Sequence, residues 1–148
     1  MSRTEIVPFA TTLLVRDSCL CLHAQRAARS LARRFDEAFR HLGLTNGQFS
    51  LLMSLNRPEP PPMGPVASLL AMDRTTLTAA LKPLQRRGLV EIIPDPNDRR
   101  GKRIGLTPEG MALLVQAAPI WERTSKDVEA LIEDGDPERL RRNLLSIS

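Results

Sequence analysis

The sequence contains no tyrosine, one tryptophan and only two histidines. Neither histidine stands beside a serine or cysteine in a recognised nucleophile motif, and no glycine-rich phosphate loop is present. Cys19 and His23, four residues apart on one predicted helix face, supply half of a metal site at most. These absences predict a protein without enzymatic activity, cofactor or metal ion.

Cysteines and long hydrophobic runs are also scarce. Cys19 and Cys21 are the only cysteines, and two cysteines so close together form no disulfide framework, which favours a reducing cytoplasm. No apolar run approaches the ~18 residues of a membrane span. The apolar stretch from Phe9 to Val15 is too short and poorly flanked for a signal peptide. We therefore expect a cytoplasmic protein that does not enter the membrane.

Charge is present but unevenly distributed along the 148 residues, a length that predicts one domain. The net charge is +4. Residues 1–47 hold seven arginines against four acids, residues 73–103 hold eight basic residues against four acids, and residues 104–148 hold eight acids against five basic residues. Most of the cations are arginines, which suit bidentate contacts with phosphate and base edges, so an anionic partner is plausible.

A long amphipathic helix is predicted from Asp17 to Leu42, ending at Gly43, because apolar residues recur there every three or four positions. These apolar residues are Leu20, Ala24, Ala27, Leu31, Phe35, Ala38 and Leu42. The charges on its other face read mostly as a solvated surface.

Shorter helices follow. Thr45 and Gln48 fit a capping box that begins a helix, and Pro65 lies in the first turn of the next one, "PVASLLAM". After a tight break at Ala71 and Met72, Asp73 is a good N-cap for "RTTLTAALKPLQRRG". Two short helices joined by a short turn predict a helix-turn-helix.

The helix after Asp73 has two distinct faces. Leu77, Leu81 and Leu84 share one side, whereas the other side is short-chained at its start and cationic later, with Thr75, Thr76, Ala79, Lys82 and Arg86. Taken alone, this exposed threonine cluster is ordinary helix surface. Its place in a helix-turn-helix makes it a candidate for contact with base edges or thymine methyl groups in a major groove.

A basic hairpin is predicted next. Leu89 to Ile93 and Lys102 to Leu106 are strand-like, and the turn-rich stretch from Pro94 to Gly101 separates them. Its tip region holds four cations, Arg99, Arg100, Lys102 and Arg103, which we expect to face solvent. Such charges can serve solubility alone. Directly after a helix-turn-helix, however, they fit the wing of a winged helix, which reaches into a minor groove.

Two more helices are predicted after the hairpin. Thr107, Pro108 and Glu109 cap the first, whose apolar spacing is interrupted by Pro119. Asp136, Pro137 and Glu138 start a last short helix.

The runs "LTNGQFSLL", "DRTTLTAALKPLQRRGLVE" and "DPNDRRGKRIGLTPEG", taken in order over residues 17–125, resemble the MarR family of dimeric winged-helix transcription regulators. The resemblance implies a mainly α fold with a small β-hairpin wing. Within residues 1–148, it implies a winged-helix DNA-binding lobe at 45–107 and a helical dimerisation region at 9–42 and 108–148.

The same resemblance implies roles for single residues. Asp98 would brace the wing, and Arg100 would enter the minor groove. The entry to the recognition helix would be formed by Arg74, Thr75, Thr76 and Thr78, with Lys82 and Arg86 nearer to phosphate. Arg99 and Lys102 belong to the same basic tip.

The expected partners are double-stranded DNA and a second copy of the chain. In this family the terminal helices of two chains interleave, which would cover the apolar faces of 9–15, 111–121 and 140–144. A two-fold dimer would read a pseudo-palindromic operator with half-sites ~10 bp apart. The implied function is a repressor that a small anionic or aromatic effector, or an oxidant, releases from DNA.

Two features bear on that signal. Cys21 falls where organic-peroxide-sensing members of the family carry a reactive cysteine. Those sensors, however, use tyrosine hydroxyls near the thiol, and this chain has no tyrosine. Cys21 also borders the apolar stripe, where a cysteine can serve as a small buried hydrophobe. Trp121 and Phe35 suit either an effector pocket or the core. The alternative function is a winged-helix protein or RNA adaptor without sequence-specific DNA readout.

Overall fold

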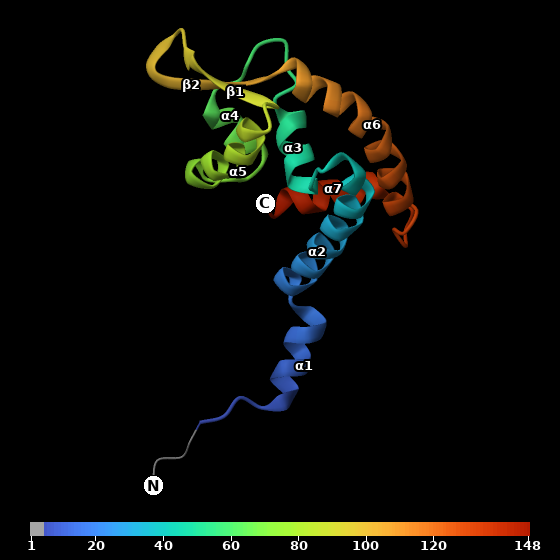
Figure 1. The fold of residues 1–148 in the computed structure, drawn as a ribbon. Coiled ribbons are helices and arrows are strands. Elements are labelled where there is room, and N and C mark those ends of the chain that lie inside the picture. Colours follow the sequence, from blue (N-terminus) through green and yellow to red (C-terminus); the bar gives the residue numbers. More distant parts are fainter. Residues whose placement is uncertain (1–4) are drawn as a thin grey trace. The chain divides into compact units, whose positions relative to one another are not determined.

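The structure is a computed structural model that describes residues 5–148; residues 1–4 of the predicted domain lie outside the described part. It divides the chain into two compact units, Met1–Arg34 and Phe35–Ser148. The described elements are seven α-helices, a short 3-10 helix and a two-stranded hairpin (Figure 1). A mainly helical chain with a small β-hairpin is therefore confirmed. The division into a DNA-binding lobe and a dimerisation region stays a prediction.

The N-terminal helical segment is broken where a single long helix was predicted. Helix α1 spans Phe9–Ser18 and α2 spans Leu20–Phe39, because Cys19 between them is extended, with φ −73° and ψ 109°. Asp17 and Ser18 precede the break, and both residue types compete with helical hydrogen bonds. At the other end α2 passes into the 3-10 helix Arg40–Leu42, and Gly43 closes it in the left-handed conformation predicted for a terminating glycine.

The predicted helix-turn-helix is present within the second unit. Helix α3 spans Asn46–Ser54 and begins with the predicted capping box of Thr45 and Gln48. Helix α4 spans Met63–Leu69, so Pro65 lies in its first turn, and α5 spans Arg74–Arg86. The break between α4 and α5 is tight because Ala71 takes a positive φ of 52°.

The hairpin is longer than predicted. Strand β1 spans Val90–Asp95 and pairs antiparallel with β2, Asp98–Leu106, in a register that sets Ile92 opposite Ile104. Asp95 Oδ1 accepts a hydrogen bond from the backbone N–H of Asn97 at 2.9 Å, which tightens the turn. Asp98 to Gly101 therefore belong to β2 and not to a long loop. We call residues 90–106 the wing.

Two C-terminal helices complete the chain. Helix α6 spans Pro108–Glu129 and continues through Pro119, which was predicted to interrupt it, and α7 spans Pro137–Ser146. Thr107 and Asp136 are their N-caps, as predicted. Among residues 5–148, no helix combines the length and apolar composition needed to cross a membrane.

The hydrophobic core is formed within residues 35–148. It joins the end of α2 to α3, α4, α5, the wing and α6, and Phe39 stacks on Phe49 with ring centroids 4.7 Å apart. The largest fully buried side chains are Phe39, Leu51, Leu52, Val66, Leu77, Leu81, Leu84 and Ile104. This core fixes α5 and the wing on one rigid base.

Candidate nucleic-acid interface

Helix α5 presents a polar face to solvent because its leucines are buried. Leu77, Leu81 and Leu84 are fully buried, as their spacing predicts, and their burial leaves the opposite side of the helix free. The exposed side chains include the predicted site residues Arg74, Thr75, Thr76, Thr78, Lys82 and Arg86.

The start of α5 is held by its cap. Asp73 Oδ1 accepts a hydrogen bond from the backbone N–H of Thr76 at 2.7 Å, and this bond lowers the pKa of the Asp73 carboxyl. The Thr78 hydroxyl donates to the carbonyl of Arg74 at 2.8 Å. Thr78 therefore has its methyl group and an acceptor oxygen left for a ligand, but no hydroxyl proton.

Asp98 shapes the tip of the wing. Its Oδ1 accepts a hydrogen bond from the backbone N–H of Arg100 at 3.0 Å. The same carboxylate lies against Gly101, where a Cβ would come within 3.0 Å of Asp98 Oδ2. These contacts fix the backbone at the start of β2 and leave the Arg99 and Arg100 side chains exposed.

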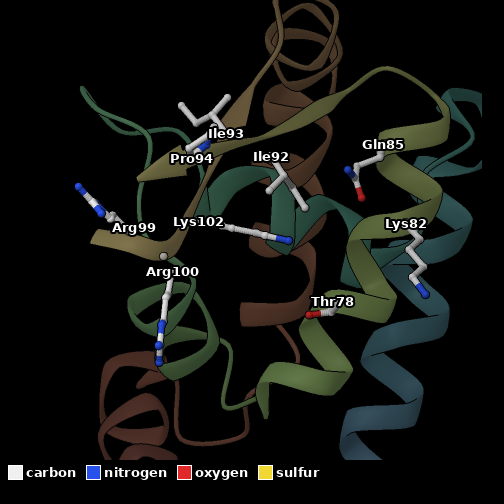
Figure 2. A pocket seen from close by; sticks show the side chains of 10 residues that line it. Thr78, Lys82, Gln85, Ile92, Ile93, Pro94, Arg99, Arg100 and Lys102 are labelled. Carbon is white, nitrogen blue, oxygen red and sulfur yellow. The ribbon is translucent and has the colours of Figure 1, made fainter. Parts of the chain in front are cut away.

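A groove of about 590 Å³ runs between α5 and the wing (Figure 2). Thr78 and Lys82 line it from the helix, and Arg99, Arg100 and Lys102 line it from the wing. A neighbouring hollow of about 400 Å³ is lined by Arg74, Thr78, Asp98, Arg100 and Lys102, among others. Seven predicted site residues are thus brought together, whereas Thr75, Thr76 and Arg86 are exposed on α5 but line neither space.

The cations of the groove are not neutralised by neighbours. Within residues 35–148, ion pairs join Arg40 to Glu37, Arg103 to Asp95, and Arg141 to Glu129 and Glu138. None of these pairs includes Lys82, Arg99, Arg100 or Lys102. A concave surface with four unpaired cations attracts a polyanion and is not explained by the stability of the fold.

Arg103 differs from the other wing cations and corrects the prediction of four solvent-facing charges. Its Nε donates to Asp95 Oδ1 at 3.1 Å and its guanidinium to the Pro60 carbonyl at 3.1 Å. Only 18% of its side chain is exposed. The pKa of Asp95 is lowered, first by the Asn97 backbone N–H and then by Arg103. Arg103 therefore ties the wing to the loop before α4.

Sequence reasoning missed some residues of the groove. Gln85 lines it, and so do Ile92, Ile93 and Pro94 of β1. Gln85 could have been found from spacing, because it follows Thr78 and Lys82 at seven and three positions, on the same helix face. The β1 residues gave no such signal, since their apolar character predicts only a strand.

Cys21 lies on α2, in the N-terminal unit, and does not line the groove. It is exposed, so the expectation of a small buried hydrophobe does not hold for the single chain. Its Sγ accepts a hydrogen bond from Gln25 Nε2 at 3.3 Å. Cys19 is half-buried, both thiols are free, and His23 Nδ1 bonds the Cys19 carbonyl at 2.8 Å. No group of three or more potential metal ligands occurs in the part of the chain described, 5–148.

Comparison with known proteins places this geometry in context. Residues 44–102, which include α3, α4, α5 and most of the wing, match the model of the MarR family. The crystal structure of the Mycobacterium tuberculosis transcriptional regulator MosR in complex with DNA is 38% identical, with a TM-score of 0.80 over 88% of this chain and 93% of that one.

Two further relatives agree. The HTH-type transcriptional repressor NicR of Pseudomonas putida is 34% identical over 83 residues, which are 56% of this chain and 52% of NicR, so the match spans about half of that repressor. The crystal structure of CouR from Rhodococcus jostii, bound to p-coumaroyl-CoA, is 25% identical, with a TM-score of 0.76 over 88% of this chain and 92% of that one.

Proposed function

The chain belongs to the MarR family of transcription regulators, and on that premise we propose that it is a homodimeric, sequence-specific DNA-binding repressor. The observation that carries this proposal is the groove between α5 and the wing, with its four unpaired cations. Its relative MosR was solved in complex with DNA.

Each element of the groove has a distinct role in this proposal. Helix α5 enters a major groove, where Thr75, Thr76 and Thr78 meet base edges and Lys82 and Arg86 meet phosphates. Arg74 stands at the helix entry. Arg100 reaches into the adjacent minor groove, while Arg99 and Lys102 contact its phosphate borders. Asp98 does not touch DNA and holds the Arg100 backbone in place.

A second copy of the chain is required by the uncovered apolar surface. Phe9 of α1, Val115 of α6 and Leu145 of α7 are 72%, 66% and 74% exposed. No residue of α1 or α7 is buried. Helices so poor in packing are marginal in water, so a two-fold dimer through these helices is the arrangement we propose. Its two recognition helices then read a pseudo-palindromic operator.

Binding can be tested with labelled DNA from the upstream region of the protein's own gene. Fluorescence anisotropy against scrambled DNA should show a specificity ratio of ~10³ or more and a steep loss of affinity with salt. A ratio near one would favour the alternative, a winged-helix protein or RNA adaptor.

Arg100 provides the sharpest single-residue test. Arg100→Ala should weaken operator binding by ~1–3 kcal/mol with the fold unchanged. Arg123→Ala is the matched control, because it removes the same charge from an exposed position on α6, outside the groove. Equal affinities for the two variants would remove Arg100 from the interface.

A second hollow suits the effector. Phe49, Met53, Leu69 and Trp121 line a space of about 410 Å³ together with Ser50 and Ser54, a size and a lining that fit a small aromatic molecule. Phe35, the other candidate, packs against the core instead. The relative CouR was crystallised with p-coumaroyl-CoA, an aromatic thioester.

Trp121 is the only tryptophan, so its fluorescence reports on this hollow directly. Titration with aromatic carboxylic acids should change the emission and release DNA over the same concentration range. Release of DNA without a change in emission would place the effector elsewhere.

The oxidant signal remains the alternative, and it would act through Cys21. Organic peroxide should then release DNA from the parent protein but not from Cys21→Ser. Release from both would assign the effect to another group. With a thiol reductant present, consumption of peroxide far beyond the roughly three equivalents that one thiol takes up on full oxidation to the sulfonic acid would instead indicate enzymatic turnover, which we do not expect.

A further inference from the structure

One flank of α2 is basic and unpaired. His23, Arg26, Ser30 and Arg33 recur at three- and four-residue spacing, and with Ala27 and Arg29 they line a shallow surface hollow of about 620 Å³. Residues 18–35 contain four arginines and no acidic residue. Within residues 5–34, no ion pair with a carboxylate involves these arginines. Arg29 and Arg33, at i and i+4, repel each other and so destabilise the helix.

This basic flank borders an apolar stripe that is equally uncovered. Leu20 is 72% exposed and Leu31 38% exposed, and α2 buries no residue before Phe39. A partner that covers this side of the helix must therefore supply two kinds of group: acidic groups, either carboxylates or phosphates, and apolar side chains. A DNA backbone offers only the first of these.

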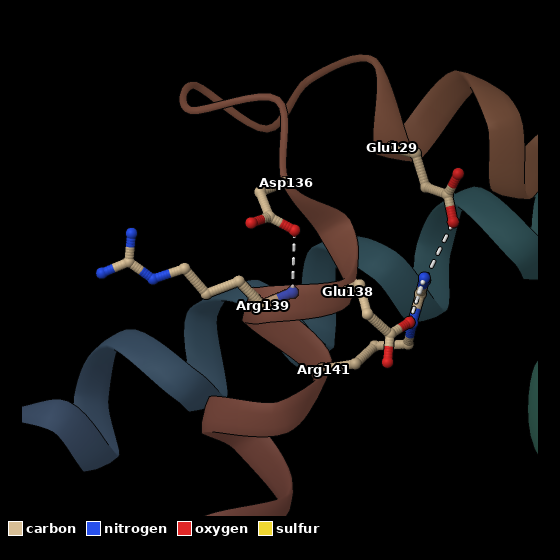
Figure 3. Close-up of polar contacts among 5 residues, drawn as sticks. All are labelled: Glu129, Asp136, Glu138, Arg139 and Arg141. Carbon is tan, nitrogen blue, oxygen red and sulfur yellow. Dashed lines mark hydrogen bonds and ion pairs between the residues drawn. The ribbon is translucent and has the colours of Figure 1, made fainter.

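The corner between α6 and α7 has the opposite composition. Residues 127–138 contain six acidic residues and neither lysine nor arginine. Arg141 donates to Glu129 at 2.9 Å and to Glu138 at 3.0 Å, and Asp136 caps α7 by accepting from the Arg139 backbone N–H (Figure 3). Within residues 35–148, neither Asp127 nor Glu133 takes part in an ion pair.

Apolar surface accompanies these acids. Glu133 and Asp134 border a hollow of about 440 Å³ whose lining includes Ile132 and Leu140. Leu131, in the turn that follows α6, is 63% exposed, and Leu140 of α7 is 43% exposed. The corner thus offers what a partner of the basic flank must supply, namely carboxylates next to apolar side chains.

We propose that the basic flank of α2 docks on the acidic α6–α7 corner of a second copy of the chain. This contact rests on the proposed homodimer, which it would stabilise through charge. In a two-fold dimer each copy supplies one flank and one corner, so the contact forms twice. Arginine suits it, because a guanidinium pairs with a carboxylate through two hydrogen bonds while its stem lies on apolar surface.

Charge reversal tests this contact through assembly. Arg29→Glu with Arg33→Glu makes the flank acidic, and Glu133→Arg with Asp134→Arg makes the corner basic. Each double variant should weaken dimerisation about tenfold in sedimentation velocity, since exposed ion pairs contribute modestly and reversal adds repulsion. Circular dichroism checks that helix content is kept.

Mixing the two variants is the decisive step. In the heterodimer the acidic flank of one chain faces the basic corner of the other, and the basic flank faces the acidic corner, so the mixture should dimerise more tightly than either variant alone. A mixture no tighter than its components would overturn the proposal. Variants that dimerise as tightly as the parent would also overturn it. If such variants lost affinity for DNA, the basic flank would instead be assigned to contact with DNA phosphates.

A reversal of the same size in the wing separates this inference from the proposed function. Arg99→Glu with Arg100→Glu should abolish operator binding and leave dimerisation intact. A parent protein that is monomeric at every concentration would refute the proposed homodimer, and the charged contact with it. A dimeric parent with unaffected flank variants would refute only the contact.

Discussion

Gly110 packs tightly against the backbone that leads into the wing, and glycine-to-alanine changes can therefore be predicted with opposite signs at two positions. A Cβ built on Gly110 would overlap the Leu89 carbonyl oxygen and lie 3.1 Å from Leu106 Cδ2. The same Leu89 oxygen accepts the backbone N–H of Thr107 at 3.1 Å. Gly110→Ala must therefore push the start of α6 away from the base of the wing.

The magnitude follows from opposing terms. Alanine in place of a helical glycine gains at most ~1 kcal/mol. Overpacking against backbone costs ~1–3 kcal/mol, and loss of the Thr107–Leu89 hydrogen bond adds ~0.5–1.5 kcal/mol. A net loss of about 2 kcal/mol is expected, which lowers Tm by roughly 4–8 °C in a chain of this size.

Gly47 is the matched control. It also lies in a helix, α3, but no atom stands within 4 Å of its built Cβ. Gly47→Ala should therefore raise stability, by up to ~1 kcal/mol. Urea denaturation at one fixed protein concentration measures both variants, because the proposed dimerisation would make stability depend on concentration. A Gly110→Ala protein as stable as its parent would refute the close approach of α6 to Leu89.

Three further outcomes are expected. Thr45→Ala should lose ~1 kcal/mol of unfolding free energy in urea because it removes the capping box of α3, whereas Thr45→Ser should keep most of it. Arg103→Ala should speed hydrogen exchange of the Ile104 amide, which bonds the Pro61 carbonyl, while Arg99→Ala should leave that rate unchanged. The pKa of the Asp36 carboxyl is lowered by the Asn46 backbone N–H and then by the Asn46 side chain. The stabilisation from these bonds is therefore fully present above pH 3.8, the ordinary pKa of the group, and is lost as the pH falls through the lower pKa of the folded state. The stability gap between the parent and Asp36→Ala should accordingly shrink in acid titrations monitored by circular dichroism, and a constant gap would contradict this assignment.

The features that were predicted well depend on neighbours in sequence. Helix starts at Thr45, Asp73, Thr107 and Asp136 each need a side-chain oxygen that reaches a backbone N–H three residues on, and all four caps form. The buried face of α5 follows from helical spacing in the same way. The break at Cys19 was missed because no proline or glycine marks it, and the apolar spacing continues on its far side.

The site was predictable as a region but not residue by residue. The order of a helix-turn-helix before a basic hairpin places α5 and the wing together, and both line one groove. Which wing side chains line it depends on the twist and pairing of the hairpin, so the β1 residues were overlooked, whereas Gln85 could have been found from its helical spacing. Their roles toward DNA remain predictions that the anisotropy measurements test.

Arg100 and Arg103 show why composition alone cannot separate a ligand-binding cation from a structural one. Both lie on β2, in the same basic run. The irregular register between Pro94 and Asp95 changes the pairing, and Asp95 reaches Arg103 at 3.1 Å. Once Asp95 and the Pro60 carbonyl hold it, the Arg103 guanidinium has little capacity left for phosphate. Asp98, by contrast, bonds only the backbone of Arg100 and leaves that guanidinium free. The two aspartates of the turn therefore treat the arginines differently: Asp95 fixes Arg103 to the fold, and Asp98 leaves the Arg100 guanidinium exposed, where we propose that it binds DNA.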